Sequence, residues 1–213
     1  MSDPTDPQSG NVDPPDRRRT RRIGVLGGTF DPPHVGHLVT AVNVRYGLGL
    51  DVVLMVVANV PWQKVDDRQI SPATDRLAMV RAAVVDDEGI EASDIEIRRG
   101  GPSYSVDTLE ALHAEDPDAE LFLILGADAA VGLDTWERAE DLASLATIVV
   151  VDRPGSVGET PRRFPVVRVE VPRLEVSSTD LRLRIRDGRP TRYLLPPGVS
   201  ELIVARKLYC CER

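Results

Sequence analysis

The chain has 213 residues, a length that fits one domain, and 42% of them are hydrophobic, which is enough to build a packed core. A formal net charge of −8 argues against a general nucleic-acid binder, because such a protein needs a basic face to displace counterions from phosphate. No apolar run reaches the roughly 20 residues of a membrane helix, so we expect neither a nucleic-acid nor a membrane partner.

The N-terminal segment is rich in Pro, Asp and Ser and almost free of apolar side chains. It predicts a disordered tail over residues 1–21 and one domain over residues 22–213. The tail has no apolar stretch of the kind found in secretory signals, and the two cysteines, Cys210 and Cys211, are adjacent. Both features favour the cytoplasm. The arginine-rich run at 17–22 is interpreted as a solvated flank, with contact to nucleic acid or an acidic partner as the alternative.

The first elements after the tail alternate between strand and helix. Residues 23–27 predict a short buried strand, and residues 51–59 a strand that is apolar on both sides. Between them, residues 35–47 predict a helix ending at Gly47. Its expected inward stripe consists of Val35, Leu38, Val39, Val42 and Tyr46.

The middle of the chain continues this alternation. Residues 71–84 predict a helix with Ser71 as N-cap and Pro72 at its first position. Residues 94–99 are a candidate strand with Ile95 and Ile97 on one face. The next four elements are a helix at 105–116 with Leu109 and Leu112 inward, a strand at 119–128, a helix at 138–146 and a strand at 147–155.

The last part of the chain is less regular. Residues 164–190 predict a strand, a loop and a short helix that begins after an N-cap at Ser178 and stops at Gly188. Residues 196–210 predict a terminal helix.

Together these elements predict an α/β fold, a Rossmann-like doubly wound parallel sheet with helices on both faces and a small C-terminal helical part. Ligands of such sheets bind beyond the carboxyl ends of the strands. Those ends carry Gly27–Gly28, Asn59, Gly126–Asp128 and Arg153–Gly155.

The first strand leads into the sequence GVLGGTFDPPHVGHL, from Gly24 to Leu38. Glycines at 27 and 28 let the backbone approach a ligand and adopt a positive φ, and the helix start that follows attracts phosphate. The segment lacks both the dinucleotide fingerprint G-x-G-x-x-G and the G-K-[ST] of a P-loop. Ordinary NAD binding and kinase-type ATP hydrolysis are therefore disfavoured.

Two of the three histidines of the chain, His34 and His37, lie in this segment. Their spacing puts both imidazoles on one face of a helix start, and Gly36 between them removes bulk where a nucleotide could pass. Each ring has an N–H donor for phosphate oxygen. Zinc binding is the competing hypothesis, but no Cys or carboxylate stands in register nearby, so we predict no metal site. A plain core histidine is the structural alternative for either one.

The segment GGTFDPPHVGH resembles the signature of the H-x-G-H nucleotidyltransferases, and VSSTDLRLRIRDGRP (176–190) is similar to their second signature. The stretches PWQK, GPSYSVDTL, GADAAVGLDTW and YLLPPGVSELI resemble one subgroup, the nicotinate-nucleotide adenylyltransferases. The resemblance runs from about residue 22 to 208. The chain departs from many relatives in PWQK at 61–64, and from some at Glu137, which affects only details of pyridine recognition.

The resemblance implies that the phosphate of nicotinate mononucleotide attacks the α-phosphorus of ATP, giving nicotinate adenine dinucleotide and pyrophosphate in a step of NAD biosynthesis. The substrate brings its own nucleophile, so catalysis is positioning and charge stabilisation. Mg²⁺ is implied as the partner of ATP, bound through phosphates and water.

The resemblance also assigns residues to the two substrates. The implied catalytic groups are His34, His37 and Arg182, and the implied ATP-binding residues are Gly27, Gly28, Thr29, Phe30, Gly36, Gly126, Asp128, Ser178 and Thr179. The implied substrate-binding residues are Lys64, Ser105, Trp136 and Arg153. The structural alternatives are a packing role for Trp136, a helix cap for Asp128, and solvated surface positions for Lys64 and Arg153.

Two other functions stay open at this point. The same fold could use another acceptor, such as nicotinamide mononucleotide or phosphopantetheine, or transfer a cytidylyl group. A catalytically silent nucleotide-binding protein would be expected to lack a phosphate-handling group, whereas His34, His37 and Arg182 are all present. The sequence does not determine the oligomeric state, and a homo-oligomer is one of the states that stay open.

Overall fold

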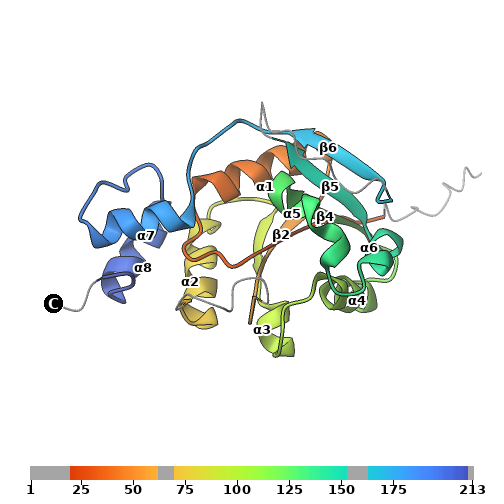
Figure 1. Cartoon of the computed structure of the whole chain (residues 1–213), viewed down its shortest axis with the longest axis horizontal. Helices are drawn as coiled ribbons and strands as arrows, with labels where there is room; N and C mark the ends of the chain where they lie inside the picture. The colour runs from red at the N-terminus through yellow and green to blue at the C-terminus, as the bar shows by residue number, and fades with distance from the viewer. Residues whose placement is uncertain (1–19, 62–69, 153–162, 211–213) are drawn as a thin grey trace, which may run out of the picture.

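A computed structural model describes residues 20–61, 70–152 and 163–210. Within these ranges six strands form one parallel sheet in the order β3-β2-β1-β4-β5-β6 (Figure 1). The strands are β1 (Arg22–Gly28), β2 (Val52–Val57), β3 (Ile90–Ser93), β4 (Glu120–Gly126), β5 (Thr147–Asp152) and β6 (Val166–Glu170). The chain runs outward from β1 to β3, crosses to β4 and then runs outward the other way. This confirms the predicted doubly wound fold and places its switch point between β1 and β4.

Helices cover both faces of the sheet (Figure 1). They are α1 (Val35–Leu48), α2 (Ala73–Ala83), α3 (Ile95–Arg99), α4 (Ser105–Glu115), α5 (Ala127–Val131), the 3-10 helix η2 (Leu133–Thr135), α6 (Ala139–Leu145), α7 (Ser178–Arg186) and α8 (Pro197–Ala205). Helices α1, α2, α7 and α8 contribute to one buried cluster, and α4, α5 and α6 contribute to a second.

The central strands alternate between these two clusters, as the period of two in a strand requires. In β1, Leu26 belongs to the first cluster, whereas Ile23 and Val25 belong to the second. Gly24 is needed for close packing, because a Cβ there would lie 2.9 Å from the side chains of both Leu50 and Val53.

The buried face of α1 differs from the predicted stripe. Ala41 and Val44 are fully buried, but Val42 is 46% exposed and Tyr46 is 89% exposed. Apolar residues lie all around this helix, so periodicity could not single out one face. The helix ends at Leu48 and not at Gly47, and its C-cap is Gly49, which has φ 59°.

Three other local predictions need correction. The N-cap of α2 is Pro72 and not Ser71, and the N-cap of α7 is Ser177, whose hydroxyl accepts from the Asp180 N–H, and not Ser178. Residues 95–99, predicted as strand, form the helix α3. Two isoleucines two positions apart were too few to distinguish the period of a strand from that of a helix. The Arg98–Asp94 ion pair, at 2.8 Å, is an i, i+4 contact typical of a helix.

The predicted tail at 1–21 lies outside the described residues except for its last two positions, so this boundary stays a prediction. Among the helices that the structure describes, none has the length and apolar character needed to cross a membrane.

Candidate active site

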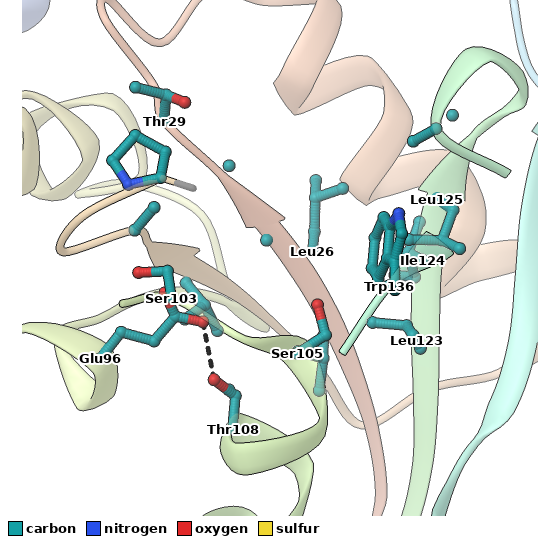
Figure 2. A pocket seen from close by; sticks show the side chains of 18 residues that line it. Leu26, Thr29, Glu96, Ser103, Ser105, Thr108, Leu123, Ile124, Leu125 and Trp136 are labelled. Carbon is teal, nitrogen blue, oxygen red and sulfur yellow. Dashed lines mark hydrogen bonds between the residues drawn. The ribbon is translucent and has the colours of Figure 1, made fainter. Parts of the chain in front are cut away.

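A cavity of about 270 Å³ opens at the switch point of the sheet (Figure 2). Gly27 and Gly28 at the end of β1 and Gly126 at the end of β4 line it, together with Thr29. At these three glycines the wall has no side chain, so a ligand can approach the backbone. Neither Gly27 nor Gly28 has a positive φ, contrary to prediction; the left-handed residue of this turn is Phe30, with φ 50°.

Ser105 and Trp136 line the same cavity (Figure 2). Ser105 is the first residue of α4, and Trp136 directly follows η2. Arg138 joins these two segments, since its guanidinium donates to Glu110 at 2.8 and 2.9 Å and to Asp107 at 3.1 Å. The hydrogen bonds between them, and then their opposite charges, raise the pKa of Arg138 and lower the pKa of Glu110, so the bridge stays ionised around neutral pH.

A buried carboxylate, that of Glu96, lines the cavity together with Ser103 and Ser105. Glu96 accepts a hydrogen bond of 2.7 Å from the Thr108 hydroxyl, and both side chains are nearly inaccessible to solvent (Figure 2). Arg99 donates to the same hydroxyl oxygen at 3.2 Å. Ser103, another lining residue, accepts from the Asn59 N–H at 2.8 Å and so links the end of β2 to this wall.

The two histidines lie at the start of α1. His34 is the N-cap and is 6% exposed, and His37 stacks on it with ring centroids 3.8 Å apart. The Nδ1 atom of His37 accepts from the His34 N–H at 3.1 Å. A nitrogen that accepts carries no proton, so the neutral His37 ring is protonated on Nε2. Phe30 also contacts His37, in an edge-on arrangement with ring centroids 5.0 Å apart.

Gly36 lets α1 and the segment before α7 approach each other. A Cβ at this position would lie 3.0 Å from both His34 Nδ1 and the Val176 side chain. Close packing against the protein therefore requires this glycine, whereas its predicted role beside a nucleotide stays a prediction.

Helix α7 is tied to the turn between β1 and α1. Arg182 donates from Nη1 to the Asp31 carbonyl at 2.6 Å and from Nη2 to Thr179 Oγ1 at 3.0 Å. The Ser178 hydroxyl donates to the Pro32 carbonyl at 2.8 Å, so its proton is already used within the protein. The second signature is therefore adjacent to the first, as predicted, although 146 positions separate Ser178 from Pro32.

The predicted site residues thus fall into three groups. The structure brings six of them to the cavity, namely Gly27, Gly28, Thr29, Ser105, Gly126 and Trp136. It places Phe30, His34, Gly36, His37, Ser178, Thr179 and Arg182 around the adjoining turn. Asp128 lies exposed in the first turn of α5 and does not line the cavity, and Lys64 and Arg153 lie outside the described residues.

Several residues of the site were missed by sequence reasoning. Arg76, which is 1% exposed, donates from Nε to the Ser71 carbonyl at 2.9 Å, from Nη1 to the Thr29 carbonyl at 2.9 Å and from Nη2 to the Asn59 carbonyl at 3.1 Å. Asp31, Glu96, Ser103 and Thr108 were also missed. The sequence contains one indication that Arg76 is buried, namely its place among the apolar residues of a predicted helix. Its partners are backbone atoms, which no sequence pattern reveals.

Comparison with known proteins agrees with this geometry. Residues 25–184 match the cytidylyltransferase-like family. A probable nicotinate-nucleotide adenylyltransferase of Corynebacterium kroppenstedtii is 46% identical over 192 residues, which cover 88% of this chain and 90% of that protein. A protein of the same description from Streptomyces coelicolor is 48% identical over 187 residues, covering 86% and 98%. The chain belongs to the nicotinate-nucleotide adenylyltransferase family.

A solved structure of this nucleotidyltransferase family shows the same fold. The nicotinic acid mononucleotide adenylyltransferase of Plasmodium falciparum, complexed with NaAD, aligns with a TM-score of 0.73 at 17% identity, covering 89% of this chain and 97% of its own. The predicted family and the predicted fold class are both confirmed.

Proposed function

We propose that this adenylyltransferase transfers the adenylyl group of ATP to nicotinate mononucleotide, releasing nicotinate adenine dinucleotide and pyrophosphate. One observation carries the proposal. A cavity with an aromatic wall at Trp136 adjoins a turn that holds the His34–His37 pair and Arg182. Such an arrangement suits a reaction in which a pyridine nucleotide meets a triphosphate at the end of β1.

The chemistry needs no protein nucleophile, because the phosphate of the mononucleotide is already ionised. It attacks the α-phosphorus of ATP, and the bond from this phosphorus to the α,β-bridging oxygen breaks, so that this oxygen leaves with pyrophosphate. Charge grows on the departing pyrophosphate, and donors placed beside it stabilise that charge. The Nε2–H of His37 and the guanidinium of Arg182 are the groups that we assign to this task.

Mg²⁺ is expected to enter with ATP and to neutralise part of the phosphate charge. Among the described residues no group of three His, Cys, Asp or Glu side chains could hold a metal ion. The side chains that we assign to the phosphates instead offer hydrogen-bond donors, namely imidazole, guanidinium and hydroxyl, whereas the Asp31 carboxylate of the turn is buried within the protein. This donor set fits phosphate oxygens, so the proposed binding partner is ATP already bound to magnesium.

The acceptor is assigned to the cavity on the other side of the β1 end. The Trp136 indole offers a face for a pyridine ring, and the Ser105 hydroxyl at the start of α4 offers a donor for its carboxylate. Asp128 and the two residues outside the described ranges, Lys64 and Arg153, stay assigned to the substrates as predicted.

The deciding experiment incubates the protein with magnesium and ATP and, in separate reactions, nicotinate mononucleotide, nicotinamide mononucleotide or phosphopantetheine. Pyrophosphate release and the mass of the product are measured, with CTP as an alternative donor. We expect the largest kcat/KM with nicotinate mononucleotide and ATP. It should exceed the kcat/KM with nicotinamide mononucleotide by about tenfold or more. The proposal would be refuted if phosphopantetheine were the one acceptor that gave pyrophosphate release. It would also be refuted if release required CTP and did not occur with ATP.

A further inference from the structure

The last described residues of the chain reach back to the turn that carries the histidine pair. Tyr209, four positions beyond the end of α8, donates its hydroxyl to Asp31 Oδ1 at 2.7 Å. Asp31 lies 178 positions earlier, between Phe30 and the residues that lead into α1. This contact joins the C-terminal segment directly to the phosphate-facing turn.

Asp31 lies at the centre of the turn and is 1% exposed. Its carbonyl oxygen accepts from Arg182, and its Oδ2 accepts from the Ser71 N–H at 3.5 Å. The carboxylate also attracts the buried Arg76 guanidinium. Asp31 is therefore the point at which α2, α7 and the C-terminal segment all hold the turn.

The C-terminal segment is itself anchored. Arg206 forms an ion pair with Asp75 of α2, and Leu208 and Tyr209 pack against the first buried cluster. Tyr209 has φ 63°, a conformation that costs a non-glycine residue free energy and that its side-chain contacts must offset. Burial and the neighbouring Asp31 carboxylate raise the pKa of Tyr209, so the hydroxyl remains a donor throughout the working pH range.

We propose that Tyr209 is a positioning residue for adenylyl transfer, which holds the phosphate-facing turn in its reactive geometry through its hydrogen bond to Asp31. This inference rests on the proposed function of the turn. Asp31 lies next to Phe30, whose ring contacts His37, and next to Pro32, whose carbonyl accepts from Ser178. A shift of Asp31 is therefore transmitted to groups on both sides of the phosphate site.

The test is the variant Tyr209→Phe, which removes one hydroxyl and keeps the ring. We expect kcat to fall about tenfold, because a hydrogen bond to a charged group is lost and the catalytic groups are less well placed. KM for nicotinate mononucleotide should stay within about twofold, since Tyr209 is not one of the residues that line the Trp136 cavity. The matched control is Tyr46→Phe, because Tyr46 is 89% exposed on α1, and its kinetics should equal those of the wild type.

A double-mutant cycle distinguishes positioning from general stability. In an Asp31→Ala background, adding Tyr209→Phe should change kcat by less than about twofold, because the hydroxyl has lost the group through which it acts. Additive effects would overturn the inference, as would a Tyr209→Phe enzyme with a lowered melting temperature but unchanged kcat.

If Asp31→Ala fails to fold, amide hydrogen exchange of Tyr209→Phe, measured by mass spectrometry, provides a second test. Peptides from residues 29–38 should exchange faster in Tyr209→Phe than in the wild type, and equal exchange would overturn the inference. The proposed function is tested separately by wild-type turnover. The role of Tyr209 is tested by the ratio of the kcat of Tyr209→Phe to that of the wild type. This ratio can be measured with whichever acceptor the wild type uses.

Discussion

The two imidazoles at the start of α1 have different environments, although they are three residues apart. His34 is nearly buried and caps the helix, while the half-buried His37 uses Nδ1 to accept the His34 N–H. That hydrogen bond fixes the tautomer and leaves Nε2–H as the donor that the ring can direct to phosphate.

Replacing His37 by Ala should lower kcat by about 100- to 1,000-fold, the cost of losing one donor to a charge that grows in the transition state. Steady-state kinetics at saturating ATP and nicotinate mononucleotide measure this effect, with circular dichroism to verify the fold. His113→Ala is the matched control, because His113 is exposed on α4. Turnover of His37→Ala within a few-fold of the wild type would remove His37 from the mechanism.

Single residues were predictable where a recognisable motif contains them. The His34–His37 pair and Arg182 belong to two signatures far apart in the sequence, and the structure brings them to one turn, while their catalytic roles stay a prediction. Asp31 and Arg76 were not predictable, because their partners are a tyrosine hydroxyl and backbone carbonyls brought close only by the tertiary fold.

At the level of elements, the long apolar strands were predicted well, because strands buried on both faces leave a continuous apolar run. Short elements were predicted less well. Helix α3 has five residues, too few for a helical period to appear, and the N-cap of α7 shifted by one because two serines stand side by side. The packing face of α1 also required the tertiary structure, since its apolar residues surround the helix.

The bridge from Arg138 to α4 gives a prediction about a whole segment. Arg138→Ala removes the bonds to Asp107 and Glu110 that hold the Trp136 segment against α4. We expect KM for nicotinate mononucleotide to rise about three- to tenfold with a smaller change in kcat, because the cavity wall is less well ordered.

Initial-rate measurements with varied mononucleotide check this prediction. Arg168→Ala is the matched control, since Arg168 also pairs with a carboxylate, donating from Nη1 to both oxygens of Asp152 at 2.8 and 2.9 Å, and does not line the cavity. An equal rise in KM in both variants would show that the Arg138 bridge has no specific role.

For the whole molecule, the main feature is that the site forms where separate parts of the chain meet. The cavity lies between the ends of β1 and β4, and the turn between β1 and α1 receives contacts from the start of α2, from α7 and from the C-terminal segment. The doubly wound order β3-β2-β1-β4-β5-β6 brings the β1 end to the centre of the sheet. Fold and site therefore depend on the same few contacts around Thr29 and Asp31.

Arg76 is the strongest test of this dependence. Its guanidinium connects the ends of β1 and β2 to the start of α2 through three backbone carbonyls, at Thr29, Asn59 and Ser71. Burial lowers the pKa of Arg76, and the Asp31 carboxylate opposes this shift, but a guanidinium remains charged at neutral pH. An Arg76→Lys variant keeps the charge but lacks the planar fork that reaches several carbonyls at once.

Arg76→Lys should therefore leave buried carbonyls without donors and lower the free energy of unfolding by about 2–4 kcal/mol. Urea denaturation followed by circular dichroism measures this change. Arg81→Lys on the same helix is the control, because Arg81 is exposed and pairs with Asp94 at the surface, and it should change stability by no more than about 0.5 kcal/mol. Similar stabilities of the two variants would mean that the three strand-end contacts do not hold the site together.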